Sequence, residues 1–351
     1  MLAIDQRALR ISWTVFLFLL LLMIIYEIRD TLLVFAGAIF FAYMLSPIVG
    51  LVERFIPKRR TLALGLVYIC LVGSLVGIGF ALIPRLASEA ISLASRMPTL
   101  VNSGKVATLP LPGFLEPMRA QVMTALRNEA SNLQDSVVPF IQSASSRIVS
   151  GVGAILPMIL VPIFAFFFLK DARAIRNAGL ELFDSDTRRS TVDTILSELH
   201  TMLQSYIRAL VILALASFAA WSIFLSLMHE PYELLLAGLA GILEFIPVIG
   251  PAVALVIMLI VCGIAGSGGF IWIIVFWGLY RVFQDYVLNP YLMSAGVELH
   301  PLLVLFGVLA GDKVGGIPGM FFSVPVLAMM KVVYTHARRA ASERHLSVVG
   351  H

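Results

Sequence analysis

Long stretches without charged side chains constrain the fold of this chain more than any other feature. Residues 11–26, 31–52, 61–84, 148–169 and 209–228 contain no Asp, Glu, Lys or Arg. A helix needs about 20 apolar residues to cross a bilayer core of about 30 Å. Of the 351 residues 60% are hydrophobic and 13% are charged, whereas about 25% of an ordinary soluble domain is charged. The pattern excludes a water-soluble enzyme and a disordered protein, and it predicts a polytopic membrane protein.

Two further apolar stretches are interrupted, and both predict broken helices. Residues 234–280 contain only Glu244 as a charged residue, and the glycine-rich segment 263–269 divides them into two helices. Residues 299–330 are interrupted by two charged residues and by glycines. We therefore expect an all-α bundle of about eight spans. Its last region would cross the membrane once, either as a broken helix or as a re-entrant hairpin followed by a span.

The positions of Lys and Arg predict the orientation of these spans. They gather near the N-terminus, in residues 53–60, in residues 170–208 and in the C-terminal tail 334–351. Because positive residues concentrate in cytoplasmic loops, both termini are expected in the cytoplasm. The first apolar run has no small-x-small cleavage site after it, so we expect an uncleaved signal anchor.

Residues 1–84 are expected to hold three spans, 85–147 an external helical insertion and 148–351 the transport core. Helical periodicity in residues 85–97 and 118–148 flanks a proline-rich loop, 98–117, that begins at Pro98. The apolar stripe of the insertion indicates packing on a neighbouring helix, or alternatively a subunit interface or a lid.

The internal polar segment, 170–208, predicts two helices joined by a turn at 184–186. Its second helix is amphipathic and leads into the apolar run that begins at Ala209. It is expected to be a solvated connector or a helix at the membrane interface.

Catalytic and metal-binding patterns are missing from the sequence. There is no P-loop, no HExxH zinc motif and no GxSxG motif. Cys70 and Cys262 lie in apolar runs without the spacing of metal ligands. We therefore expect no enzyme, no cofactor, no metal and no nucleic-acid partner.

The first candidate site is the segment around Glu244. Pro247, Gly250 and Pro251 follow within seven residues and open the helix, so the freed carbonyl groups must face protein or water. Glu244 lies about ten residues into its apolar run, near the expected midplane. An ionised carboxylate there costs about 2.5–3.5 kcal/mol, so it should face the interior of the bundle.

The second candidate site is the segment around Asp312 and Lys313. Gly316, Gly319 and Pro325 follow it, which predicts an unwound stretch with an internal ion pair. Alternatively, the two charged residues form a turn at the membrane interface. Two interrupted hydrophobic segments in one half of a chain are the pattern of a substrate site between discontinuous helices.

A third polar group lies between these two segments. Gln284, Asp285 and Asn289 fall on roughly one helical face, and Arg281 lies one turn earlier. This face could line a vestibule, or it could cap a span at the interface. The positions expected to act as hinges or helix breaks are Pro290, Pro301, Gly316, Gly319 and Pro325. His300 and Pro301 mark the start of the next helix.

These motifs resemble the autoinducer-2 exporter family of bacterial inner-membrane proteins. The resemblance rests on VPIFAFFFLKD (161–171), YIRALV (206–211), LAGLAGILEFIPVIGP (236–251), VLNPYLMSAGVELHPLLVLFGVLAG (287–311) and GGIPGMFFSVPVLAMMKVV (315–333). With the order of the spans and the position of the insertion, it covers nearly the whole chain.

The resemblance implies about eight spans, a homo-oligomer (a pentamer) and the export of small molecules. Some members are named for the quorum-sensing signal autoinducer-2, and others resemble sodium or lithium/proton antiporters. The positions carried over by motif are Glu244, Pro247, Gly250, Pro251, Asn289, Pro290, His300, Pro301, Gly316, Gly319 and Pro325. Lys313 is a departure from the pattern, because its charge would neutralise Asp312 and weaken cation coupling there.

Three functions follow as hypotheses. The first is ATP-independent export of a small polar, autoinducer-2-like metabolite, with Glu244 titrating or binding the coupling ion. The second is antiport of sodium or lithium against protons, using the same carboxylates. The third is a scaffold or regulator that transports nothing and acts through the insertion 85–147. Besides the lipid bilayer, the expected partners are the metabolite or a monovalent cation and proton.

Overall fold

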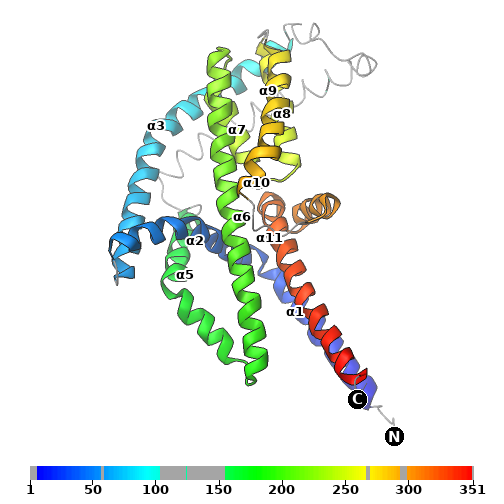
Figure 1. Cartoon of the computed structure of the whole chain (residues 1–351). Helices are drawn as coiled ribbons and strands as arrows, with labels where there is room; N and C mark the ends of the chain where they lie inside the picture. The colour runs from blue at the N-terminus through cyan, green and yellow to red at the C-terminus, as the bar shows by residue number, and fades with distance from the viewer. Residues whose placement is uncertain are drawn as a thin grey trace.

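The computed structural model describes residues 6–56, 59–102, 124, 155–265, 269–292 and 299–349. In these ranges the chain forms helices joined by short turns, without a strand, as Figure 1 shows. Six of the helices in these ranges are long and apolar enough to cross a membrane. The expected all-α polytopic fold is confirmed, and the count of about eight spans stays a prediction.

Three helices form the N-terminal part. Helix α1 (Gln6–Glu27) has no buried residue in its apolar stretch, so it contributes little to the core of the single chain. Helix α2 (Arg29–Phe55) packs on α5 and α3 (Arg60–Asn102). Leu45 and Leu64 are buried at the centre of this cluster.

Helix α3 continues through residue 84, the expected boundary between the N-terminal spans and the external insertion. It ends only at Asn102, so the expected loop does not begin at Pro98. Leu93 packs into the core of the helices that follow, and Ala94 is buried. These contacts keep the segment helical beyond the apolar run. The second expected helix of the insertion, 118–148, lies outside the described residues apart from Thr124.

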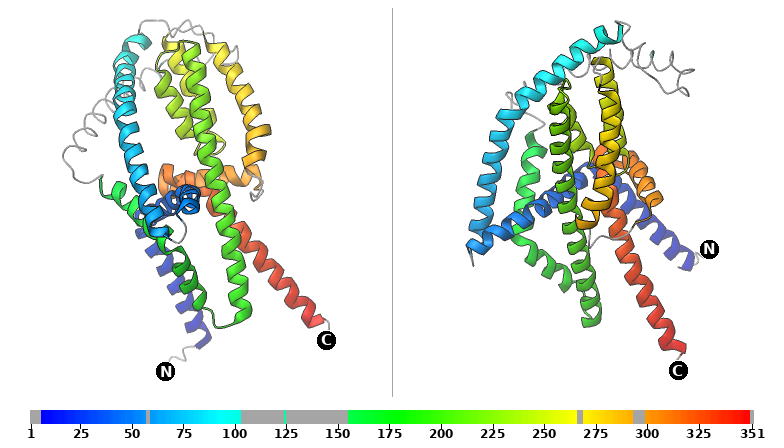
Figure 2. Two further views of the ribbon diagram at one scale, coloured as in Figure 1. Left: turned by 60° about the vertical axis from the view of Figure 1, so that its left-hand side comes forward. Right: turned by 45° about the horizontal axis from the view of Figure 1, so that its top comes forward.

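Helices α5 (Ile155–Glu181) and α6 (Asp186–Leu227) contain the internal polar segment. The turn expected at 184–186 falls between them, and the ion pair from Arg176 Nη2 to Asp193 Oδ1 (2.7 Å) ties the two helices together. Figures 1 and 2 show α7, α8 and α9 gathered beside the apolar C-terminal half of α6.

The segment around Glu244, expected to be one broken span, is a helical hairpin. Helix α7 (Glu233–Leu243) ends just before Glu244, and α8 (Ile249–Ala265) begins after a tight turn. The backbone of Gly250 lies directly on the carbonyl oxygen of Leu243, because the chain reverses there. At 1.5 Å per residue α7 is about 16 Å long, roughly half the thickness of a bilayer core.

The segment from Phe270 to Leu292 is continuous. Helix α9 (Phe270–Phe283) passes into a π-helical turn, η3 (Gln284–Leu288), and then into α10 (Asn289–Leu292). Pro290 was expected to break this helix. Its ring would collide with the carbonyl group of Tyr286 in a regular α-helix. The wider π-turn just before it relieves that collision, so the helix goes on.

The last region also forms a hairpin. Helix α11 (Pro301–Val349) is bent at Gly315 and Gly316, where the backbone leaves helical geometry. We call its two parts the first arm (301–314) and the second arm (317–349). Gly311 of the first arm lies against Gly319 of the second, backbone to backbone. The structure therefore has the hairpin arrangement rather than one broken helix, and the tail 334–351 continues the second arm as a helix through Val349.

Candidate functional site

A cavity of about 290 Å³ lies where the two hairpins meet α6 and η3. Its wall combines apolar side chains with a few polar groups, as small-molecule sites do. The lining residues are Met202, Ser205, Tyr206, Leu210 and Leu213 from α6; Glu244, Pro247, Val248 and Pro251 from the first hairpin; Arg281, Gln284 and Asn289; and Leu299, Val304, Val324, Pro325 and Ala328.

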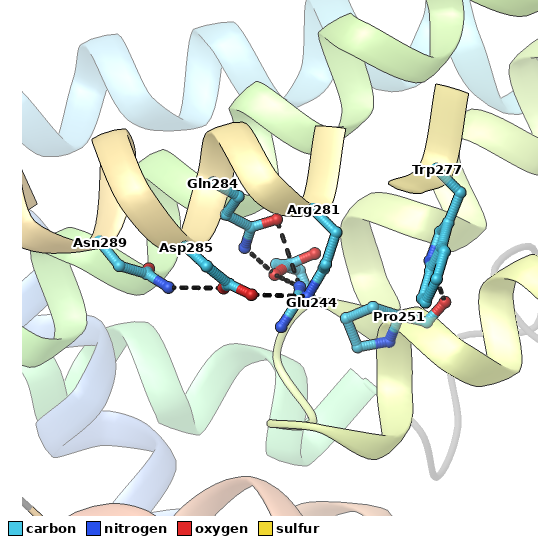
Figure 3. Close-up of polar contacts among 7 residues, drawn as sticks. All are labelled: Glu244, Pro251, Trp277, Arg281, Gln284, Asp285 and Asn289. Atoms are coloured by element: carbon cyan, nitrogen blue, oxygen red, sulfur yellow. Dashed lines mark hydrogen bonds and ion pairs between the residues drawn. The ribbon is translucent and has the colours of Figure 1, made fainter. Parts of the chain in front are cut away.

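Glu244 is the buried carboxylate of this site, with 8% of its surface exposed. Its Oε1 accepts a hydrogen bond from Gln284 Nε2, and Arg281 Nη1 lies 3.4 Å from the same oxygen as an ion pair (Figure 3). Gln284 is 2% exposed. The sequence placed it on one helical face with Asp285 and Asn289, but did not predict its bond to Glu244. A buried charge needs such partners, because leaving it unpaired costs several kcal/mol.

Asp285 shares the same guanidinium group. Arg281 Nε lies 3.6 Å from Asp285 Oδ2, and Asn289 Nδ2 donates to Asp285 Oδ1 at 3.1 Å. The network therefore contains one cation and two carboxylates. It also fixes the side-chain amides, since the NH₂ group of Asn289 must face the carboxylate of Asp285 and its Oδ1 must point away.

The π-turn explains why these side chains converge. The N–H of Asn289 bonds to the carbonyl of Gln284, five residues earlier. This wider turn brings Gln284 and Asn289 onto the same wall of the cavity, although a spacing of five residues diverges in a regular α-helix. Such π-turns within α-helices are frequent at functional sites.

The turn between α7 and α8 is strained. Val248 has φ of 68°, in the left-handed region that β-branched residues rarely adopt. Pro247 precedes it, and the carbonyl of Pro251 accepts a hydrogen bond from Trp277 Nε1 at 3.2 Å. Strain of this kind costs about 1–3 kcal/mol and persists only where the surroundings impose it.

Glu244 lies beside the charge-free run of α6. It shares one cavity with Leu210 and Leu213, and nearby Gly241 packs on Ala214 and Phe218. These partners belong to the run 209–228. The position of Glu244 near the midplane of the membrane stays a prediction.

Two polar atoms of the cavity residues are buried and have no hydrogen-bond partner among the described residues. They are the hydroxyl oxygen of Tyr206 and Oδ1 of Asn289. Tyr206 was not predicted as a site residue, although it begins one of the segments that carry the family resemblance. Its signal in the sequence is weak: a hydroxyl group on an aromatic residue just before an apolar run.

The second expected site is not part of the cavity. Asp312 is half-buried and Lys313 is exposed on the first arm of α11, and no ion pair joins them in the described part of the chain. Gly316 has φ of 60° and forms the bend of the hairpin, whereas Gly319 lies in the helix and serves close packing. The described residues also contain no group of three potential metal ligands.

The prolines of α11 differ from the expected hinges. Pro301 begins the helix, where its missing N–H has no intrahelical partner to lose. His300 Nδ1 accepts from the backbone N–H of Leu302 at 3.3 Å, in a capping role. The helix continues through Pro325, which lines the cavity instead.

Comparisons with known proteins agree on one class. The sequence matches a family described as "AI-2E family transporter" over residues 15–339. YueF of Bacillus subtilis (strain 168), named as a transport protein, is 24% identical over 89% of this chain and 85% of its own. PerM of Escherichia coli (strain K12), named as a permease, is 30% identical over 84% of each chain. A transport protein of Methanothermobacter thermautotrophicus is 27% identical over 86% of each.

Proposed function

Because this chain belongs to the AI-2E transporter family, we propose that it exports a small polar, autoinducer-2-like metabolite without using ATP. The family is one of transporters and permeases, not of enzymes. The observation that carries the proposal is the buried network of Glu244, Gln284 and Arg281 on the wall of a cavity. That cavity lies between two helical hairpins, which is where transporters with discontinuous helices bind substrate.

In this proposal the turn of the first hairpin moves against η3. The substrate replaces part of the bonding between Gln284 and Glu244, which lets the strained turn at Val248 relax. The second hairpin closes the other side through Val304 and Pro325. The two glycine contacts, at Gly250 and Gly311, let the arms of each hairpin move as units.

The cellular setting of the proposal is the bacterial inner membrane, with both termini in the cytoplasm. The polar N-terminal half of α6 and the C-terminal tail then lie on the same, cytoplasmic side. A homo-pentamer would cover the apolar surface of α1, which packs on little within the single chain. Autoinducer-2 would link the protein to quorum sensing.

Uptake of autoinducer-2 into inside-out membrane vesicles tests the proposal. Glu244→Gln keeps the size of the side chain and removes its charge, and we expect it to slow uptake at least tenfold. Glu181→Gln is the matched control, since Glu181 is exposed at the end of α5. The oligomer should elute unchanged in size-exclusion chromatography. Wild-type uptake by the Glu244→Gln protein would refute the proposal.

A second candidate is antiport of sodium or lithium against protons. It is favoured by one observation, namely that Glu244 and Asp285 share a single guanidinium group. One negative charge is therefore available for a cation or a proton. Release of protons when sodium or lithium is added to energised vesicles, lost in Glu244→Gln, would distinguish it from metabolite export.

The scaffold hypothesis ranks below both. It would be favoured by the lack of a polar cavity near Glu244, whereas Glu244 lines the cavity described above. It would also be favoured if deleting the insertion 85–147 abolished function and left the spans folded.

A further inference from the structure

Three oxygen atoms of residues that line the cavity have no hydrogen-bond donor among the described residues. Both bonds to Glu244 end on Oε1, which leaves its Oε2 without a hydrogen bond from the described residues. Asn289 turns its NH₂ group to Asp285, so that Oδ1 is left as a buried, unpartnered acceptor. The hydroxyl oxygen of Tyr206 is also buried and has no hydrogen-bond partner among the described residues. Because Asn289 Oδ1 and the ionised Glu244 Oε2 can only accept, a ligand that bonds to them must bring N–H or O–H donors, and the Tyr206 hydroxyl can accept from such a donor as well.

The charges of the network favour a positive ligand. Arg281 contributes the cation of the network, and its Nη1 and Nε contact Glu244, Gln284 and Asp285. Two carboxylates therefore share one guanidinium, which leaves a net charge of −1 when both are ionised. In a site of low dielectric constant this charge attracts a cation and repels an anion much more strongly than it would in water.

The remaining wall sets the size and shape of the ligand. Leu210, Leu213, Val304 and Ala328 are apolar and offer no further bonds. A volume of about 290 Å³ is near the lower end of known small-molecule sites. The cavity therefore suits a short molecule with one charged end and a small carbon skeleton.

We propose that this cavity selects small protonated amines, whose ammonium group binds among Glu244 Oε2, Asn289 Oδ1 and the hydroxyl of Tyr206. The inference rests on the proposed transport function and specifies its substrate class. It goes beyond an inorganic cation site, because the Tyr206 and Asn289 atoms and the apolar wall are suited to an organic molecule with several donors.

Binding of three two-carbon probes to the purified full-length protein tests the inference. Ethanolammonium, ethylene glycol and glycolate share nearly the same skeleton and carry charges of +1, 0 and −1. Their apparent affinities are measured by thermal shift at constant sodium chloride concentration, since a ligand that binds the folded state raises the melting temperature. We expect ethanolammonium to bind about tenfold more tightly than ethylene glycol, and glycolate not to bind. Equal affinities, or the reverse order, would overturn the inference.

Three variants assign the binding to the cavity. Tyr206→Phe removes one hydroxyl group and should weaken ethanolammonium binding about threefold to tenfold. Tyr68→Phe is the matched control, because the hydroxyl of Tyr68 bonds to the carbonyl of Pro162 outside the cavity. Glu244→Gln should remove the preference for the cation over ethylene glycol. An unchanged preference in Glu244→Gln would place the binding elsewhere and refute the inference.

The two proposals fail separately. If ethanolammonium binds with the expected order but no flux of autoinducer-2 or amine occurs, the transport proposal fails and the binding class stands. If autoinducer-2 is transported while the three probes bind equally, the amine inference alone fails.

Discussion

The two hairpins have a similar architecture, but their bends make different kinds of contact. Each consists of two helical arms joined by a bend rich in glycine or proline. The bend between α7 and α8 holds Glu244, which bonds to residues of a third helix. The bend of α11 holds Gly315 and Gly316, and the nearby charges of Asp312 and Lys313 do not pair with each other.

The difference shows what turns a break in a helix into a site. Glycine and proline provide the reversal in both places. Only the first hairpin meets a helix that supplies a buried amide and a guanidinium, Gln284 and Arg281. In the second, close packing of Gly311 on Gly319 takes the place of polar bonding. We therefore expect the stability of the first hairpin to depend on its charged and polar contacts, and that of the second on close backbone packing.

The largest effect is expected from removing the cation of α9 that pairs with Glu244 of the first hairpin. Arg281→Gln leaves Glu244 without its counter-charge, which should lower the free energy of unfolding by about 3 kcal/mol. The double variant Glu244→Gln/Arg281→Gln should recover most of this loss, because no buried charge is then unpaired. Unfolding by dodecyl sulfate in mixed micelles measures both. A double variant as unstable as Arg281→Gln would contradict the electrostatic account.

The second hairpin should respond to size instead. A Cβ atom at Gly311 would collide with the carbonyl oxygen of Gly319, so Gly311→Ala should cost about 1–3 kcal/mol. Gly65→Ala on α3 meets open space and favours the helix, so it should be neutral or stabilising. The same unfolding assay compares the two. Equal stability of both variants would show that the arms do not need this close approach.

A smaller effect of opposite sign is expected in the first bend. Val248→Gly removes a side chain from the left-handed region and should raise the free energy of unfolding by about 1 kcal/mol. Val253→Gly, on the exposed side of α8, should lower it by about 1 kcal/mol. If Val248→Gly is destabilising as well, the bend is not strained by its valine.

The smallest effect is expected from the charges of the second hairpin. Asp312→Asn combined with Lys313→Gln should change the stability by less than about 0.5 kcal/mol, as at ordinary surface positions. Uptake into vesicles should stay within about twofold of wild type, in contrast to Glu244→Gln. A loss of uptake comparable to that of Glu244→Gln would mean that both hairpins carry the chemistry.

Much of the fold could be predicted from the sequence. Charge-free runs indicated the membrane helices, and the proline and glycine pattern marked both bends. Whether the chain reverses at a bend was not predictable, because that depends on close backbone packing at Gly250 and Gly311. The sequence alone therefore favoured one broken span around Glu244, where the structure has two antiparallel helices.

The site was only partly predictable for a similar reason. Periodicity placed Gln284, Asp285 and Asn289 on one face with Arg281 one turn earlier, and isolation in an apolar run singled out Glu244. No local pattern pairs Glu244 with residues about 40 positions later, so its bond to Gln284 was not predictable. Tyr206 escaped because a tyrosine at the end of an apolar run is common at membrane interfaces.

The π-turn of η3 bears on how this chain tolerates insertions and deletions. A single π-turn amounts to one extra residue inside an α-helix. Deleting Val287 would therefore restore a regular α-helix in which Asn289 still lies one turn from Gln284, because their backbone bond changes from an i+5 to an i+4 bond. Residues after the turn would keep their orientation, and Val287 itself is 52% exposed. A deletion in the regular part of α9 would instead rotate everything after it by about 100°. The π-turn is thus a place where this helix can lose a residue without changing which side chains face the cavity.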